Sequence, residues 1–155
     1  MKKYIGTKII EAEPAYRCMD GSGKVVITTR PEEAFPNYPS VEDGYRVRYP
    51  DGYVSWSPKA VFEEAYRPTD GMNFGLAIEA AKRGHKITRR GWNEKNQYVE
   101  LATDISYTDA SGTVINAEHQ AIGSRALAFV GTSGVQMGWL ASQADMLAED
   151  WEIVE

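Results

Sequence analysis

Apolar residues recur at two spacings along the chain, and each spacing predicts a different kind of element. Aromatic and β-branched residues alternate with polar residues at 44–49 and 52–56, on either side of the turn Pro50-Asp51-Gly52. A period of two places every second side chain on one face of a strand, and an Asp-Gly pair is typical of a tight turn. The pattern therefore predicts a β-hairpin in the first half of the chain.

A helical period follows Asn73. The apolar residues stand at positions that share one face of a helix: Phe74, Ala77, Ile78 and Ala81. Asn73 is a residue type that caps helix N-termini, and Gly84 is suited to end the helix after two cations, Lys82 and Arg83. This segment predicts the principal helix of the chain.

Two shorter helices are also indicated. Ser57 and Pro58 supply an N-cap and a first helical residue for a helix that ends near Arg67. Close to the C-terminus, Ser142 and Asp145 are spaced as in a capping box, in which each side chain bonds the backbone N–H group of the other residue. This pair predicts a capped turn of helix.

Strands are predicted where β-branched and aromatic residues gather. These segments are 25–28, 86–90, 98–102, 127–130 and 151–154. The rest of 14–43 is rich in Gly, Pro and Ser and is expected to be loop. The polar stretch 104–123, with a turn near Asp109, is expected to be an insertion or a hairpin excursion.

Together these elements predict an α+β fold in two modules. A β-rich N-terminal module is expected at 1–69, and a C-terminal module of one main helix packed on a mostly antiparallel sheet at 70–155. The boundary is placed at Pro68-Thr69-Asp70-Gly71 because this tetrapeptide breaks the preceding helix.

The composition is that of an ordinary folded protein and excludes several functional classes. The 155 residues are 43% hydrophobic and 25% charged. No apolar run approaches the roughly 20 residues of a membrane span, and the N-terminus lacks the apolar core of a secretory signal. We therefore expect a cytoplasmic protein without a membrane partner.

The cysteine, histidine and charge counts narrow the chemistry further. Cys18 has no second cysteine to pair with, and only His85 and His119 are available as imidazole ligands, so neither a disulfide nor a structural zinc is expected. No cofactor is predicted. A net charge of −5 also disfavours binding to nucleic acid polymers, which depends on neutralising many phosphates.

The positive charge is concentrated in one strip of the C-terminal half. Six of the seven basic residues after Gly71 fall within fourteen positions: Lys82, Arg83, Lys86, Arg89, Arg90 and Lys95. Such a strip is either a solvated face or a surface that receives a small anion.

Four residues of this region suit a nucleotide. Arg89 and Arg90 offer guanidinium groups for phosphate, Trp92 offers a ring for a base, and Asn93 offers an amide for base edges or ribose hydroxyls. The alternative is that Trp92 and the other C-terminal tryptophans, Trp139 and Trp151, form core.

Three blocks of the C-terminal half resemble one protein family. Residues 71–80, 88–93 and 139–151 are similar, in order, to the small phage and prophage family that includes the second type of Thoeris anti-defence protein. Residues 51–59 look like part of an extension found in front of this domain in some phage members.

The resemblance implies a non-catalytic sponge. Members of the family bind the cyclic ADP-ribose type of signal made by the bacterial Thoeris sensor and hold it away from its effector, and some relatives resemble sponges for the cyclic oligonucleotides of CBASS. They form homo-oligomers, typically tetramers, with ligand pockets at protomer interfaces. The resemblance thus implies action in the cytoplasm of an infected bacterium.

The resemblance also implies a set of ligand contacts. Trp92 and Asn93 would contact the ligand, with Arg89 or Arg90 near phosphate. The pocket would be closed by three residues of the last block: Trp139, Ser142 and Asp145. Asp145 would accept ribose hydroxyls or an amino group.

Two other classes of function stay open from the sequence. One is an enzyme that cleaves such a nucleotide with Asp145 or Glu149, although no His or Cys stands near them. The other is a structural or interaction module of a phage particle or host-takeover complex, in which the tryptophans are core and the basic strip faces a protein partner.

Overall fold

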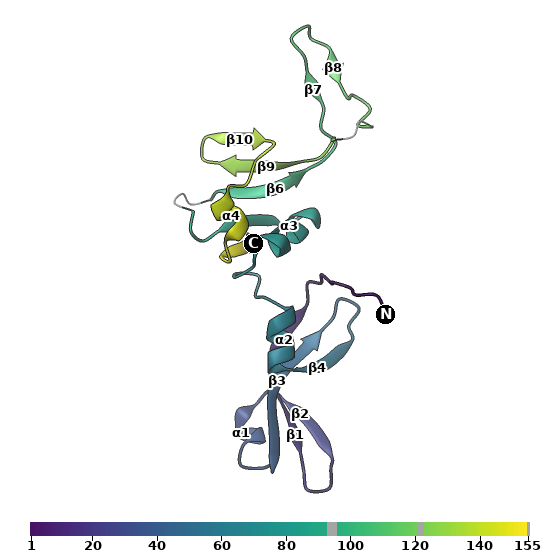
Figure 1. Ribbon diagram of the computed structural model, residues 1–155, viewed down its shortest axis with the longest axis vertical. Helices are drawn as coiled ribbons and strands as arrows, with labels where there is room; N and C mark the ends of the chain where they lie inside the picture. Colours follow the sequence, from purple (N-terminus) through teal and green to yellow (C-terminus); the bar gives the residue numbers. More distant parts are fainter. Residues whose placement is uncertain (93–95, 121–122, 155) are drawn as a thin grey trace. The chain divides into compact units, whose positions relative to one another are not determined.

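The structure is a computed structural model that describes residues 1–92, 96–120 and 123–154 (Figure 1). It is mixed, with several short helices and a majority of strands, and every strand pairing among the described residues is antiparallel. Contacts divide the chain into two compact units, Met1–Arg67 and Pro68–Glu155, which we call the N-terminal unit and the C-terminal unit.

The N-terminal unit is a four-stranded sheet with two short helices. Its strands lie in the order β2-β1-β3-β4. The elements are β1 (Glu11–Met19), β2 (Val25–Thr28), α1 (Pro31–Ala34), β3 (Ser40–Arg48), β4 (Val54–Pro58) and α2 (Lys59–Ala65). The predicted hairpin is confirmed as β3 and β4, and the predicted strand at 25–28 is confirmed as β2.

The loop expected across 14–43 is wrong, because β1 and the start of β3 occupy much of it. Nine residue pairs join these strands, from Glu11 opposite Arg48 to Met19 opposite Ser40. One face of the pair carries cross-strand ion pairs, and mostly apolar side chains alternate with these charges on the other face. The loop prediction followed the Gly, Pro and Ser residues of the region and missed this alternation. Pro14 is tolerated since β2 pairs only with residues 16–19, which leaves β1 unpaired on that side at the proline.

Trp56 lies across the face of the sheet that carries the ion pairs. Its indole Nε1–H donates to the carbonyl oxygen of Ala15 at 3.3 Å, and its ring covers Gly44 of β3. Ala15 and Gly44 are buried as a result. A side chain at position 44 would occupy the space that the indole fills.

The opposite face of the sheet packs on α2 through stacked aromatic rings. Tyr45 stacks on Phe62 with ring centroids 4.1 Å apart, and Phe62 stacks on Tyr66 at 5.0 Å. The helix begins at Lys59 without a side-chain cap, so the prediction that Ser57 caps it is wrong. Ser57 pairs with Tyr45 as part of β4, and the strand runs directly into the helix.

The C-terminal unit contains a five-stranded sheet in the order β10-β9-β6-β5-β11 and a separate two-stranded hairpin, β7-β8. Its elements are α3 (Phe74–Lys82), β5 (Lys86–Arg89), β6 (Tyr98–Ala102), β7 (Tyr107–Thr108), β8 (Val114–Ile115), β9 (Ala126–Gly131), β10 (Gly134–Met137), α4 (Gln143–Leu147) and β11 (Trp151–Val154). Strands were predicted at β5, β6, β9 and β11 and are confirmed.

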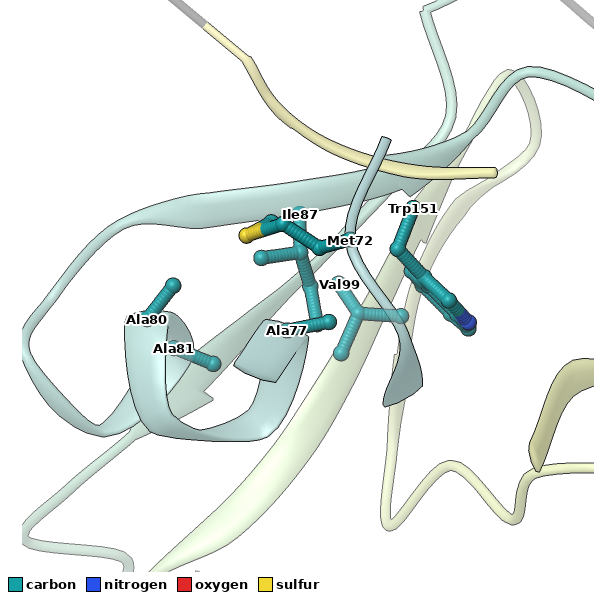
Figure 2. Close-up of a cluster of buried hydrophobic side chains, with 7 residues drawn as sticks. All are labelled: Met72, Ala77, Ala80, Ala81, Ile87, Val99 and Trp151. Carbon is teal, nitrogen blue, oxygen red and sulfur yellow. The ribbon is translucent and has the colours of Figure 1, made fainter. Parts of the chain in front are cut away.

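Helix α3 is confirmed together with both of its predicted ends. The side chain of Asn73 accepts a hydrogen bond from the backbone N–H of Leu76 at 2.9 Å, and Gly84 has the positive φ of 93° that favours glycine after a helix. Three alanines of α3 meet Ile87, Val99 and Trp151 in the buried cluster (Figure 2): Ala77, Ala80 and Ala81. Small side chains let the helix lie close to the sheet.

The polar excursion is confirmed as a hairpin, while β10 escaped prediction. Figure 1 shows β7 and β8 leading away from the end of β6 and β9. The carboxylate of Asp109 accepts from Ser111 and Thr113 at the tip, and Asp20 accepts from Ser22 and Lys24 in the same way between β1 and β2. Strand β10 is fully exposed, so burial gives it no apolar pattern.

No helix among the described residues is long and apolar enough to span a membrane.

Replacing Gly44 with alanine should destabilise the N-terminal unit. An ideal Cβ at this position would lie 2.5 Å from Cζ2 of Trp56 and would also clash with the carbonyl oxygen of Ser57. Because that oxygen belongs to the sheet backbone and cannot move freely, we expect a loss of about 1–3 kcal/mol in the free energy of unfolding. Gly21→Ala is the control, since a Cβ there meets nothing within 4 Å. Equal denaturant midpoints for the two variants would contradict the packing of Trp56 on Gly44.

Candidate functional site

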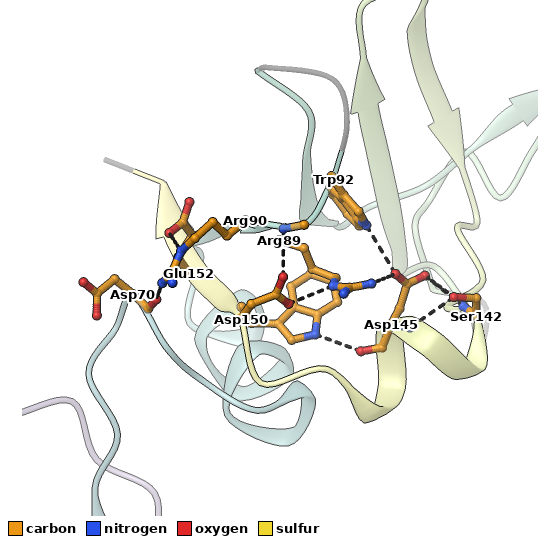
Figure 3. A network of polar contacts seen from close by, with 10 residues as sticks. Asp70, Arg89, Arg90, Trp92, Ser142, Asp145, Asp150 and Glu152 are labelled. Carbon is orange, nitrogen blue, oxygen red and sulfur yellow. Dashed lines mark hydrogen bonds and ion pairs between the residues drawn. The ribbon is translucent and has the colours of Figure 1, made fainter.

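Two carboxylates converge on Arg89 in the C-terminal unit (Figure 3). Nη1 of Arg89 lies 2.9 Å from Oδ1 of Asp145, and its Nε lies 2.9 Å from Oδ1 of Asp150. The three side chains are only 18%, 13% and 29% exposed, respectively. Charge-assisted hydrogen bonds of this kind are stronger than those between neutral groups.

The elements around the site explain why these residues meet. Arg89 is the last residue of β5 and pairs with Trp151, the first residue of β11, so Asp150 lies beside the end of β5. Asp145 belongs to α4, whose predicted capping box with Ser142 is confirmed. Antiparallel pairing and a helix cap thus bring together residues that are 56 and 61 positions apart.

The carboxylate of Asp145 is fully engaged by the protein. Oδ2 accepts from the backbone N–H of Ser142 at 3.0 Å and from its hydroxyl at 2.8 Å. Oδ1 accepts from Arg89 and from the indole Nε1–H of Trp92 at 3.2 Å. A carboxylate has about four lone-pair positions, so this arrangement uses its capacity.

Three successive backbone N–H groups are bonded in the turn that follows Arg89. The N–H of Arg90 donates to the carbonyl oxygen of Asp150 at 3.1 Å, and that of Gly91 donates to Oδ2 of the Asp150 side chain at 2.8 Å. The N–H of Trp92 closes the turn on the carbonyl oxygen of Arg89 at 3.2 Å. The backbone that leads to Trp92 is therefore held by bonds to Asp150 and by the bond that closes the turn on Arg89.

Three tryptophans meet edge to face beside this turn. The ring centroid of Trp92 lies 5.4 Å from that of Trp151 and 6.1 Å from that of Trp139, with interplanar angles of 76° and 73°. Trp151 is fully buried and is core, whereas Trp92 and Trp139 are half-buried and pack against the core from its edge. The interpretation of the tryptophans as core is therefore confirmed for Trp151.

The basic strip is largely paired within the protein. Arg90 contacts Glu152 at 3.9 Å and donates to the carbonyl oxygen of Asp70, on the other side of the turn from Trp92 (Figure 3). Lys82 pairs with Glu79 at 2.9 Å. Asn93 and Lys95 lie outside the described residues, so the structure does not place their predicted roles.

Among the candidate residues, the structure brings four into one bonded network and leaves two beside it. Arg89, Trp92, Ser142 and Asp145 are bonded together. Trp139 joins through its ring contact with Trp92, and Arg90 points away. The sequence did not identify Asp150 and Gly91 as members of the network. Both strands beside them were predicted, and knowing that β5 pairs with β11 would have placed these two residues side by side.

The network shifts the pKa values of its members. Burial raises the pKa of Asp145, but hydrogen bonds from Arg89, Ser142 and Trp92 outweigh it and the net pKa is lowered. The pKa of Asp150 is lowered chiefly by Arg89, and that of Arg89 is raised by Asp150 and then Asp145. Two ionised carboxylates around one guanidinium give the cluster a net negative charge at neutral pH. No group of three or more potential metal ligands occurs among the residues that the structure describes.

Removing the guanidinium should reverse the pH dependence of stability. A carboxylate whose pKa is depressed on folding stabilises the protein above its unfolded pKa of about 4 and loses that contribution as pH falls through the folded value. In Arg89→Met, Asp145 and Asp150 lose their shared cation, so burial and mutual repulsion raise their pKa values. We expect a loss of roughly 3 kcal/mol at pH 7 that is partly recovered at pH 5.

Denaturant unfolding at both pH values measures this reversal. Arg90→Met is the control, because its side chain is 63% exposed and its ion pair is long, and it should cost less than about 1 kcal/mol. If Arg89→Met kept the pH profile of the parent protein, Arg89 would not be the group that depresses the two pKa values.

The C-terminal unit, which contains this network, is similar to a known protein family. A family model for the Thoeris anti-defense 2-like domain matches residues 72–154, which include every candidate site residue. The protein Thoeris anti-defense 2 of Bacillus phage SP01 is 37% identical over 90 residues, which covers 54% of this chain and 94% of that protein. The match to the family spans more than half of the chain, and the chain therefore belongs to the Thoeris anti-defense 2-like family.

Proposed function

We propose that this chain is a phage anti-defence protein that binds a cyclic nucleotide immune signal and sequesters it from its effector. The ligand is of the glycocyclic ADP-ribose type, with cyclic oligonucleotides as a second class, so that Thoeris or CBASS effectors stay inactive. Family membership and the name of the phage relative support the anti-defence role. Because the family model matches residues 72–154, we assign binding to residues 70–155.

The observation that carries this proposal is the fixed, partly buried pair Trp92 and Trp139 at the edge of the core. The indole N–H of Trp92 is bonded to Asp145, and its ring packs edge to face against three other rings, so its orientation is set before a ligand arrives. Bases stack on such rings, and a rigid site avoids the entropy cost of ordering side chains on binding. Asn93 and Ser142 flank the pair in sequence and complete the proposed contacts.

Of the two arginines, Arg90 is the better phosphate contact. Arg89 is enclosed by two carboxylates, and a phosphate near it would meet the net negative charge of that cluster. The side chain of Arg90 is mostly exposed and its contact with Glu152 is long, so it can turn toward an anion by giving up that contact and its bond to the carbonyl oxygen of Asp70. Asp145 then acts chiefly by holding Trp92 and Arg89, and it reaches a ligand hydroxyl only by exchanging one of its present donors.

Sequestration without cleavage agrees with the state of the acids. Asp145 and Asp150 have lowered pKa values and accept several hydrogen bonds, which makes them weak proton carriers near neutral pH. Glu149 is exposed to solvent. Binding alone needs no general base, so we propose a non-enzymatic protein without a cofactor.

We also propose that the chain forms a homo-oligomer, with four copies as the expected number. Strand β10 is the outer strand of the five-stranded sheet, and Val135 and Met137 on it are 64% and 53% exposed. An exposed apolar edge strand is a ready template for pairing with another chain. Leu140, which follows Trp139 directly in the sequence, is also an exposed apolar residue, so we propose that a second copy on this edge lies next to the site. Neither a nucleic acid polymer nor a membrane is among the proposed partners.

Ligand capture tests the proposal directly. The purified protein is incubated with glycocyclic ADP-ribose or with single cyclic di- and trinucleotides, then denatured, and the released compound is identified by mass. We expect one intact ligand per binding site. Altered ligand, with excess consumed by a small amount of protein, would establish an enzyme, and no capture of any compound would favour a structural or interaction module.

Variants of the tryptophans test the site within the same assay. Loss of a base-stacking ring costs about 1–3 kcal/mol, so Trp92→Ala and Trp139→Ala should each weaken binding by roughly tenfold to a hundredfold. Trp56→Phe is the control, because Trp56 lies in the N-terminal unit. Unchanged affinity in both alanine variants would remove the tryptophans from the site.

The assembly should have four times the 17.3 kDa mass of one chain in multi-angle light scattering. The double variant Val135→Asp and Met137→Asp should reduce that mass, since charges on an exposed edge strand oppose pairing. Val114→Asp, on the hairpin and equally accessible at 52% exposure, is the matched control. A parent protein of monomer mass would overturn the oligomer proposal.

A further inference from the structure

Asp150 makes three separate bonds to the turn that carries Trp92. One side-chain oxygen accepts from Nε of Arg89 at 2.9 Å, and the other accepts from the backbone N–H of Gly91 at 2.8 Å. Its backbone carbonyl accepts from the N–H of Arg90 at 3.1 Å. Asp150 thereby bonds each of the three residues that precede Trp92.

Gly91 is required at this turn by space, not by backbone conformation. The φ angle of Gly91 lies outside the positive range that favours glycine, so an L residue could adopt this backbone conformation. An ideal Cβ at this position would, however, lie 2.8 Å from Oδ2 of Asp150 and 3.4 Å from Nη2 of Arg89. The absence of a side chain lets the carboxylate reach the backbone N–H.

We propose that Asp150 is a positioning residue for ligand binding, which fixes the ring of Trp92 through the N–H of Gly91 and the guanidinium of Arg89. The inference rests on the proposed function, because it assigns Trp92 to the ligand. It adds two residues, Asp150 and Gly91, that act without touching the ligand. We call the carboxylate of Asp150 and the two donors it holds the Gly91 clasp.

The geometry explains how the Gly91 clasp controls the ring. Trp92 is fixed at its indole N–H by Asp145 and at its backbone N–H by Arg89, and the turn between these points contains only Arg90 and Gly91. If Asp150 releases Gly91, the backbone of the turn can rotate while the indole bond stays in place. The ring then tilts relative to Trp139, and the surface that a base would stack on loses its shape.

Asp150→Asn tests the clasp with almost no change in volume. Gly91 and Arg89 donate to different oxygens of Asp150, and an asparagine replaces one of these oxygens with an NH₂ group, which then faces one of the two donors. We expect affinity for glycocyclic ADP-ribose to fall at least tenfold. Gly91→Ala should have a similar effect, because its Cβ displaces the same carboxylate.

A double variant distinguishes the proposed positioning role from a general loss of protein stability. Since both changes break the same contact, Asp150→Asn combined with Gly91→Ala should weaken binding about as much as either change alone. Ile87→Val, which removes a methylene from the buried cluster, serves as a control for lost stability. Gly75→Ala is the control for glycine substitution, because its Cβ makes only an ordinary 3.5 Å contact. Both controls should bind as the parent does.

The indole N–H resonance of Trp92 in nuclear magnetic resonance spectra supplies a readout that does not need the ligand. It should shift in Asp150→Asn and Gly91→Ala, while the indole resonance of Trp56 in the N-terminal unit stays in place. Parent-level affinity in Asp150→Asn would overturn the inference, as would binding losses that add in the double variant. If the parent protein binds none of the cyclic nucleotides, the proposed function fails, and an unshifted Trp92 resonance would refute the clasp separately.

Discussion

Arg89 is the group on which the arrangement of the C-terminal unit depends. It stands at the end of β5 and is bonded to two carboxylates that come from the last segment of the chain, one on α4 and one just before β11. Each carboxylate also accepts hydrogen bonds from other groups. Asp145 accepts from the N-cap residue of α4 and from the indole of Trp92, and Asp150 accepts from the backbone N–H of Gly91. A helix end, a turn and an aromatic ring are thus all oriented through one guanidinium. Its planar shape, with donors in fixed directions, suits this task in a way that a lysine would not.

The same arrangement reduces the positive charge that the basic strip can offer to a ligand. A count of positive residues suggests a surface ready for phosphate, but Arg89 is surrounded by acids and Lys82 is paired along its own helix. Charge that serves to hold a site together is not available to a ligand. A site with aromatic faces and few uncommitted cations would gain most from cations supplied by a neighbouring copy, which fits the oligomer proposed above.

Helix caps and tight turns could be predicted from the sequence, because each depends on residues only a few positions apart. The cap at Asn73, the capping box of Ser142 and Asp145, and the hairpin around Asp51 and Gly52 each depend on residues a few positions apart, and each is confirmed. Strand β1 was missed because Pro14 and the Gly and Ser residues that follow favour a loop, although charged and apolar residues alternate along the strand. The contacts of Asp150 and Gly91 depend on the register between β5 and β11, which no neighbouring residue encodes. Family resemblance pointed to Trp92 and Asp145 but could not show that Asp145 is already occupied.

The edge-to-face contacts among Trp92, Trp139 and Trp151 have an optical consequence. Indole transitions on rings about 5 to 6 Å apart and steeply inclined to one another couple strongly, and fixed aromatic packing is what produces near-ultraviolet circular dichroism. Trp56 lies in the N-terminal unit, so three of the four indoles that absorb in this protein are gathered in one cluster. The chain carries an intrinsic chromophore whose ellipticity reports the order of that cluster without any label.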